Sequence, residues 1–188
     1  MELYKRIIEL IDANLIHCLI PIILTLIFME LIFKNRFETK KVLNLIRWTI
    51  IIYTIVTFTF YLIEMAMNPD EHAFINRANG PYAIAYWIMF FGALILPLTL
   101  FIKNLASKFW YVLFVAFGMK SGMYLERFVI LTTSFHRDYQ TENGNLRLIE
   151  SVTYGIGIFF IQGIIIAMLT LGIFEIIKRN KNGVKHVV

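Results

Sequence analysis

The sequence predicts an all-α membrane protein with five transmembrane helices, arranged as a four-helix bundle plus one flanking C-terminal helix, with a short N-terminal interfacial helix. Hydrophobic residues make up 59% of the 188 residues, against roughly 45–50% in soluble domains. Charged residues make up only 16%, against roughly 25%. They lie in short intervals between long apolar runs, and this pattern excludes a soluble enzyme.

Five apolar runs are long enough to cross a bilayer, since a spanning helix needs roughly 20 residues at about 1.5 Å each. The first four predict a bundle over residues 14–135, and the last predicts the flanking helix. The expected spans are residues 14–33, 45–67, 82–102, 108–135 and 152–177. An outward loop at 136–151 precedes the last span, and a basic tail at 178–188 follows it.

Residues 1–13 precede the first span. They carry apolar Leu3, Ile7 and Leu10 at helical spacing, with charged residues between them. This alternation is typical of an amphipathic helix that lies in the membrane interface. We therefore expect an interfacial anchor at the N-terminus.

Lys and Arg are distributed unequally between the two sets of loops. Eleven lie in residues 34–47, 103–108 and 178–188, whereas five lie in residues 1–13, 68–81 and 136–151. The positive-inside rule then predicts a cytoplasmic C-terminus and an N-terminus outside. The net charge of +5 follows from these loops, so nucleic acid is not expected as a partner.

Ionisable side chains inside or at the end of the predicted spans are the strongest candidates for function, because a charge at mid-bilayer costs at least about 2.5 kcal/mol. The candidates for a proton path or for ion pairing are Glu64, Lys120, Glu126, Arg127, His136, Arg137, Asp138, His17 and Glu30.

Two interpretations of these groups stay open. In the first, Arg127 or Lys120 pairs with Glu64 or Glu126 and locks the helices in register. In the second, the outer groups exchange protons with the outside and Glu30 marks an inner limb. Hydroxyl groups on the second to fourth spans could connect such a path, although they also commonly bond back to helix carbonyls.

Asn14 and His17 lie one turn apart at the outer end of the first span. This spacing could hydrogen-bond a quinone carbonyl at the membrane surface, although a solvated interface position is the plainer interpretation. No metal site is expected, because Cys18 is the only cysteine and the four histidines lie far apart.

Two sequence stretches carry a resemblance to a known family. They read HAFINRANGPYAIAYWIMF at residues 72–90 and GMYLERFVILTTSFHRDY at residues 122–139. A Gly-Pro-Tyr turn opens a helix that contains a Tyr-Trp pair, and an ERF…SxHRD string ends the next helix. In these features the chain resembles the NrfD, or polysulfide-reductase membrane-subunit, superfamily, and most closely the C-terminal half of the ActC-type quinol-oxidising subunit of alternative complex III.

The resemblance implies an integral subunit of a respiratory quinol:electron-acceptor oxidoreductase in the bacterial inner membrane, contributing bundle structure and a proton path to electron transport. It implies no cofactor bound by this chain, with quinol or menaquinol, iron–sulfur clusters and haem in partner subunits. The implied partners are a second NrfD-like half or a full-length membrane subunit, an extracytoplasmic iron–sulfur subunit and cytochrome c subunits.

Two other functions fit the same charges. One is a stand-alone small proton or cation transporter or channel. The other is a structural or assembly membrane protein.

Overall fold

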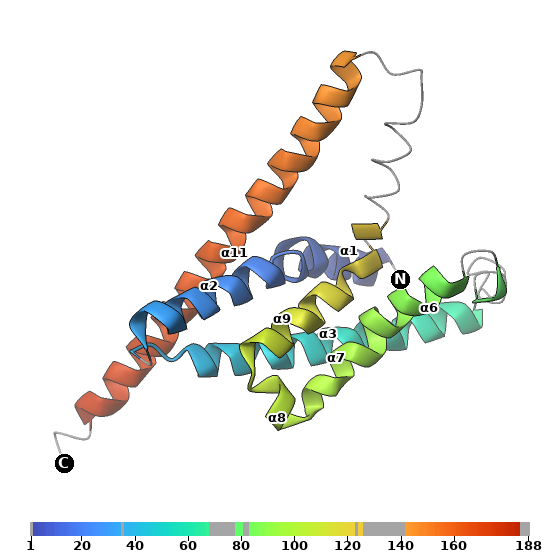
Figure 1. Cartoon of the computed structure of the whole chain (residues 1–188). Helices are drawn as coiled ribbons and strands as arrows, with labels where there is room; N and C mark the ends of the chain where they lie inside the picture. Colours follow the sequence, from blue (N-terminus) through green and yellow to red (C-terminus); the bar gives the residue numbers. More distant parts are fainter. Residues whose placement is uncertain are drawn as a thin grey trace. The chain divides into compact units, whose positions relative to one another are not determined.

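The computed structural model describes residues 2–34, 36–67, 78–80, 83–122, 124–125 and 142–184, with the main chain alone at 2, 142–154, 156 and 181–184. The described residues form helices joined by turns, with no strand among them (Figure 1). The chain divides into two compact units, Met1–Leu45 with Leu125–Val188, and Ile46–Tyr124.

Four helical stretches in the described ranges are long and apolar enough to cross a membrane. They are Leu3–Phe33, Thr39–Met67, Ala83–Phe101 and Gly157–Asn180. Large apolar side chains are exposed along them, such as Leu31 at 68% and Ile84 at 79%. Soluble proteins rarely expose contiguous surface of this kind. The chain is therefore an all-helical protein whose helices indicate a membrane-embedded location.

The first unit contains the N-terminal helices and the C-terminal helix. Its elements are α1 (Glu2–Ile11), the π-helical turn η1 (Asp12–Ile16), α2 (Leu19–Phe33), the first turns of α3 (Thr39–Met67), and α11 (Glu142–Val184). Helix α11 begins earlier than the expected start at residue 152, so part of the expected outward loop is helical. Helix α3 likewise begins earlier than the expected residue 45.

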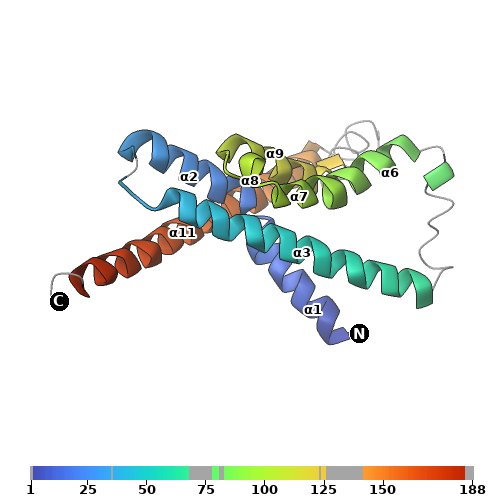
Figure 2. The ribbon, with the colours of Figure 1, turned by 90° about the horizontal axis from the view of Figure 1, so that it is seen from below.

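Helices α2 and α11 of the first unit pack together and run parallel (Figure 1; Figure 2). Asn14 contacts Gln162 just before α2 begins. Glu38 contacts Lys178 just after α2 ends. Between these contacts, a Cβ at Gly163 would come within 2.6 Å of Pro21 Cγ, so only glycine permits the approach.

The second unit contains most of α3 and the helices that follow it. These are α6 (Ala83–Phe90), the π-helical turn η2 (Phe91–Ile95), α7 (Leu96–Leu98), the 3₁₀ turn η3 (Thr99–Phe101), α8 (Lys103–Ala106) and α9 (Phe109–Met119). The segment from α6 to η3 is the expected third span. Its irregular turns surround Pro97, which lacks an N–H and crowds the carbonyl four residues earlier.

Contacts within the second unit fix two antiparallel pairs of segments. Arg47 donates from Nε to the Leu100 carbonyl at 2.7 Å, and the Phe58 and Phe90 rings lie 6.3 Å apart, so α3 runs opposite to the third span. The Tyr111 hydroxyl contacts Thr99 Oγ1 at 2.6 Å. Farther along, a Cβ at Gly92 would lie 2.5 Å from the Gly118 oxygen, so α9 runs back along the third span (Figure 2).

The expected fourth span, residues 108–135, is described only in its first part. Helix α9 ends at Met119, and Ser121, Gly122, Tyr124 and Leu125 are also helical. Residues 126–141 lie outside the described ranges. A total of five spans therefore stays a prediction at this point.

We predict that Gly163→Ala destabilises the protein by about 1–3 kcal/mol, because the added methyl group collides with the Pro21 ring and overpacks the α2–α11 contact. Gly157→Ala on the same helix is the matched control, since its Cβ meets nothing within 4 Å in the described part of the chain. Thermal unfolding in detergent would measure both variants. Equal melting temperatures would contradict the assigned contact.

Candidate functional site

The structure describes five of the ten predicted site residues. Asn14, His17 and Glu30 lie in the first unit, and Glu64 and Lys120 lie in the second. The other five lie outside the described residues, namely Glu126, Arg127, His136, Arg137 and Asp138.

Asn14 lies in the π-helical turn η1, and His17 directly follows that turn, just before α2 begins. Residues 12–16 form the π-helical turn η1, which holds one more residue per turn than an α-helix. Such turns are frequent at functional sites. The wide turn brings His17 beside Asp12, and Phe159 of α11 packs against the His17 ring at 5.1 Å between centroids.

The hydrogen bond of His17 indicates the tautomer of its neutral ring. His17 Nδ1 lies 2.6 Å from the main-chain oxygen of Asp12, and 3.5 Å from Oδ2 of the same residue. A carbonyl oxygen can only accept, so we assign the proton of the neutral ring to Nδ1. The lone pair is then on Nε2, which is the atom that takes up a second proton.

Asn14 links this turn to α11. Gln162 donates from Nε2 to Asn14 Oδ1 at 3.1 Å and to the Asn14 main-chain oxygen at 3.3 Å. Asn14 in turn donates from Nδ2 to the Leu10 carbonyl at 2.8 Å. The amide therefore already has donor and acceptor partners, and a quinone would have to compete with Gln162 for it.

Glu30 lies at the opposite end of α2 and accepts a 2.5 Å hydrogen bond from the Thr39 hydroxyl. Thirteen residues separate it from His17, which is roughly 20 Å of helix. The intervening part of α2 is apolar and mostly buried, and Thr25 donates back to the Pro21 carbonyl at 2.7 Å. In the described part of the first unit, polar side chains therefore lie at both ends of α2, and an apolar stretch separates them.

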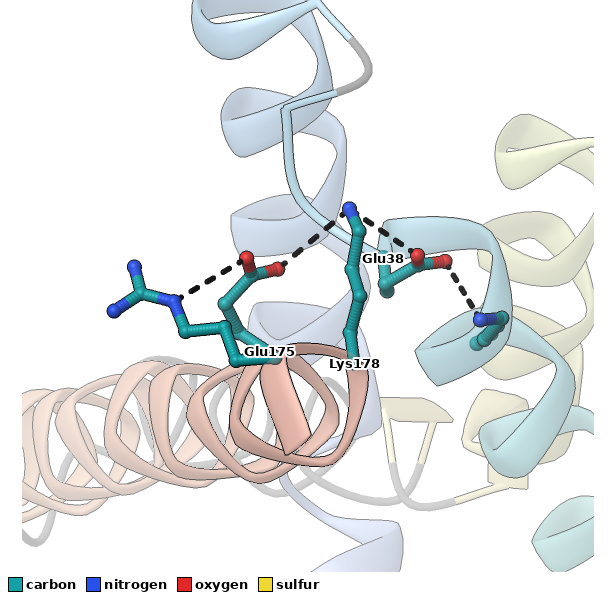
Figure 3. A network of polar contacts seen from close by, with 5 residues as sticks. Glu38, Glu175 and Lys178 are labelled. Atoms are coloured by element: carbon teal, nitrogen blue, oxygen red, sulfur yellow. Dashed lines mark ion pairs between the residues drawn. The ribbon is translucent and has the colours of Figure 1, made fainter. Parts of the chain in front are cut away.

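An ion-pair network that the sequence did not predict joins Glu38 to α11 (Figure 3). Lys178 Nζ lies 3.3 Å from Glu38 and 3.9 Å from Glu175. Lys41 lies 3.2 Å from Glu38, and Arg179 lies 3.9 Å from Glu175. The spacing of Glu38 and Lys41 is visible in the sequence, whereas the contact of Glu38 with Lys178 depends on the parallel packing of α2 and α11.

Lys41 and Lys178 lower the pKa of Glu38 from its ordinary value, because both ammonium groups hydrogen-bond its carboxylate. The charged form of Glu38 is thus favoured in the folded state.

In the second unit, Lys120 is buried at the end of α9 and Glu64 is half-buried near the end of α3. The expected ion pair joins Arg127 or Lys120 to Glu64 or Glu126. Because Arg127 and Glu126 lie outside the described residues, this ion pair stays a prediction. Arg47, counted only as a loop charge in the sequence, is instead buried. It donates to the carbonyls of Leu100 and Phe101 and so satisfies the end of the third span.

The hydroxyl groups expected to line a path mostly bond to their own helices. Thr57 donates to the Tyr53 carbonyl at 2.8 Å, and Thr59 to the Ile55 carbonyl at 2.7 Å. Thr54 lines a pocket of about 390 Å³ with Tyr61 and Tyr86. Its hydroxyl oxygen is enclosed and has no hydrogen-bond partner among the described residues. Thr57 and Thr59 are therefore satisfied within α3.

No group of three His, Cys, Asp or Glu residues that could hold a metal ion occurs in the described ranges. No protein-family model matches the chain, and no curated protein or solved structure is significantly similar to it.

We predict a pH dependence of stability that Glu38→Gln removes. Because the pKa of Glu38 is lowered by folding, its contribution is complete above the unfolded value, near 4.5, and is lost as the pH falls below that value through the folded pKa. Unfolding would be followed in detergent between pH 7 and pH 3. The wild type should lose more stability than Glu38→Gln, and parallel curves would contradict the network.

Proposed function

We propose that this chain is a five-span integral subunit, like the C-terminal half of an NrfD-type protein, of a respiratory quinol:electron-acceptor oxidoreductase in the bacterial cytoplasmic membrane. Its N-terminus lies outside and its C-terminus is cytoplasmic. It supplies bundle structure and a proton-accepting group, His17, while quinol, iron–sulfur clusters and haem belong to its partners.

The parallel packing of α2 and α11 is the observation that carries the five-span topology. Two spanning helices that run in the same direction must be separated by an odd number of crossings. Helix α3 and the segment Ala83–Phe101 account for two. A third crossing by residues 108–135 makes the number odd, whereas a chain of only four spans would leave α2 and α11 antiparallel.

The course of α9 supports that third crossing. It starts beside Thr99, at the inner end of the third span, and passes Gly92 at Gly118. A Cβ at Gly122 would lie 3.3 Å from the Met89 sulfur, so the chain has by then returned most of the way along that span. The next residues in the sequence are the ERF string of the resemblance.

The other resembling motif also has a structural counterpart. Trp87 of the Tyr-Trp pair donates from Nε1 to the Ala78 carbonyl at 3.2 Å. Its ring packs against Tyr86 and Phe90 at 5.7 Å.

His17 supports a proton-handling role at the outer surface. Its tautomer is set by Asp12, its side chain is only 17% exposed, and its proton-accepting atom is Nε2. Residues 68–81 and 136–151 are the proposed docking site of an extracytoplasmic iron–sulfur subunit. Most of these loop residues lie outside the described ranges.

Cysteine labelling tests the topology. In a Cys18→Ser background, single cysteines would be placed by Lys5→Cys, Lys40→Cys and Asn180→Cys and treated with a membrane-impermeant maleimide. Five crossings with the proposed orientation predict that only Lys5→Cys is labelled in intact spheroplasts, and that all three are labelled after lysis. Labelling of Asn180→Cys together with Lys5→Cys would refute the odd number of crossings.

Purification of the tagged chain from its native membrane in a mild detergent tests the complex. We expect haem absorption bands and co-purifying iron–sulfur subunits, identified by optical spectra and mass spectrometry. In that complex, His17→Gln should preserve assembly and lower proton-coupled turnover by about 10²-fold, a usual contribution of a general acid–base group.

Gln162→Leu is the matched control, because it removes the amide bond to Asn14 but keeps His17. It should leave turnover per assembled complex unchanged. A colourless homo-oligomer would refute the respiratory assignment and favour a stand-alone transporter. Equal turnover of His17→Gln and the wild type would refute the role of His17.

A further inference from the structure

The pocket that Thr54 lines lies between α3 and the third span, within the second unit, and has a volume of about 390 Å³. Its walls are mainly aromatic. Phe58 and Tyr61 come from α3, and Tyr86 and Phe90 come from α6. The Phe58 and Phe90 rings meet edge to face at 6.3 Å, and the Tyr86 and Phe90 rings stack at 6.2 Å. The volume is within the range of small-molecule sites, ~300–1,000 Å³.

The pocket begins near the middle of α3. Thr54 lies 15 residues after Thr39 and 13 before Met67, and α3 rises about 10 Å from Thr54 to Tyr61. When α3 spans a membrane, this stretch lies within the hydrocarbon core, which is about 30 Å thick. None of the described residues that line the pocket is charged. A ligand here must therefore be uncharged and soluble in the membrane, because no lining residue would compensate a charge.

Thr54 supplies an unusual polar group to this apolar pocket. It is only 2% exposed, and its hydroxyl oxygen has no hydrogen-bond partner among the described residues. Thr57 and Thr59 of the same helix instead donate to the carbonyls four residues earlier. A buried hydroxyl without a partner is rare and lowers stability unless something else satisfies it. Because threonine populates two χ1 rotamers in a helix, a ligand in the pocket can draw this hydroxyl to itself.

The wall contributed by the third span includes Ala93 and Leu94 of the π-helical turn η2. Turns of this kind are frequent at functional sites. The Ala93 side chain is exposed and adds only a methyl group to the lining. A larger side chain at this position would therefore fill part of the pocket.

We propose that this pocket binds an uncharged, membrane-soluble aromatic molecule that carries a hydrogen-bonding oxygen, with its rings against Phe58 and Phe90 and its oxygen bonded to Thr54. Aromatic rings pack edge to face or offset-stacked against aromatic walls. A lipid acyl chain would fill the same space but leave the Thr54 hydroxyl without a partner. The site is separate from His17, and it does not depend on the proposed respiratory complex.

Photolabelling with benzophenone, an uncharged two-ring ketone, tests the site on the full chain in nanodiscs. The protein would be irradiated at increasing benzophenone concentrations, and the labelled peptides would be identified by mass spectrometry. We expect saturable labelling within residues 54–61 and 86–94. Labelling that does not saturate and is spread over the exposed apolar residues of α11 would overturn the proposal.

Thr54→Val separates ligand binding from folding, because valine keeps the shape of the side chain and removes the hydroxyl. The half-saturating benzophenone concentration should rise about fivefold, a usual contribution of one hydrogen bond. Without benzophenone, the same variant should melt about 3 °C higher than the wild type, because it removes a buried hydroxyl that lacks a partner. Thr59→Val is the matched control. Thr59 bonds to the Ile55 carbonyl and does not line the pocket, so this variant should label like the wild type.

A second pair of variants tests the shape of the pocket. Ala93→Phe should abolish saturable labelling by filling the space. Ile84→Phe enlarges a side chain on the same span that is 79% exposed and does not line the pocket, and it should have no effect. Circular dichroism of each variant would establish that it is folded.

Equal half-saturating concentrations for Thr54→Val and the wild type would overturn the proposal, as would saturable labelling of Ala93→Phe. So would a lower melting temperature of Thr54→Val, because it would show that the hydroxyl has a structural partner. None of these measurements uses a partner subunit or His17, so their failure and the failure of the respiratory assignment are distinguishable.

Discussion

The close approach of α2 and α11 at Gly163 is the constraint on which the rest of the structure depends. It joins segments from opposite ends of the sequence, and it joins them in parallel. If two parallel helices both span a membrane, the chain between them must cross that membrane an odd number of times. The same contact brings Gln162 to Asn14 at one end of α2 and Lys178 to Glu38 at the other.

Polar groups in the first unit gather at the ends of this helix pair, while its middle is apolar. Burying an unpaired polar group in hydrocarbon costs several kcal/mol, and Thr25 in the middle of α2 avoids this cost by donating to the Pro21 carbonyl. A proton entering at His17 therefore has no route along α2. If the chain conducts protons, the route must involve other residues, and the predicted carboxylates of the second and fourth spans are the available ones.

The sequence predicted the helical class and most of the span positions because apolar runs of sufficient length determine both. It singled out Asn14 and His17 at α-helical spacing, whereas residues 12–16 form a π-helical turn. It missed Gln162, Phe159 and the contact of Glu38 with Lys178, because these depend on which spans pack together. It also counted Arg47 only as a loop charge, although the buried Arg47 side chain donates to two carbonyls at the end of the third span.

The π-helical turn at residues 12–16 explains why the His17 ring lies against Asp12. In a regular α-helix the Asp12 carbonyl would accept from the N–H four residues on. Here it accepts from His17, five residues on, at 2.9 Å. The same oxygen accepts from His17 Nδ1, so one carbonyl sets both the width of the turn and the tautomer of the ring. The helix irregularity and the chemistry of the site thus have a single cause.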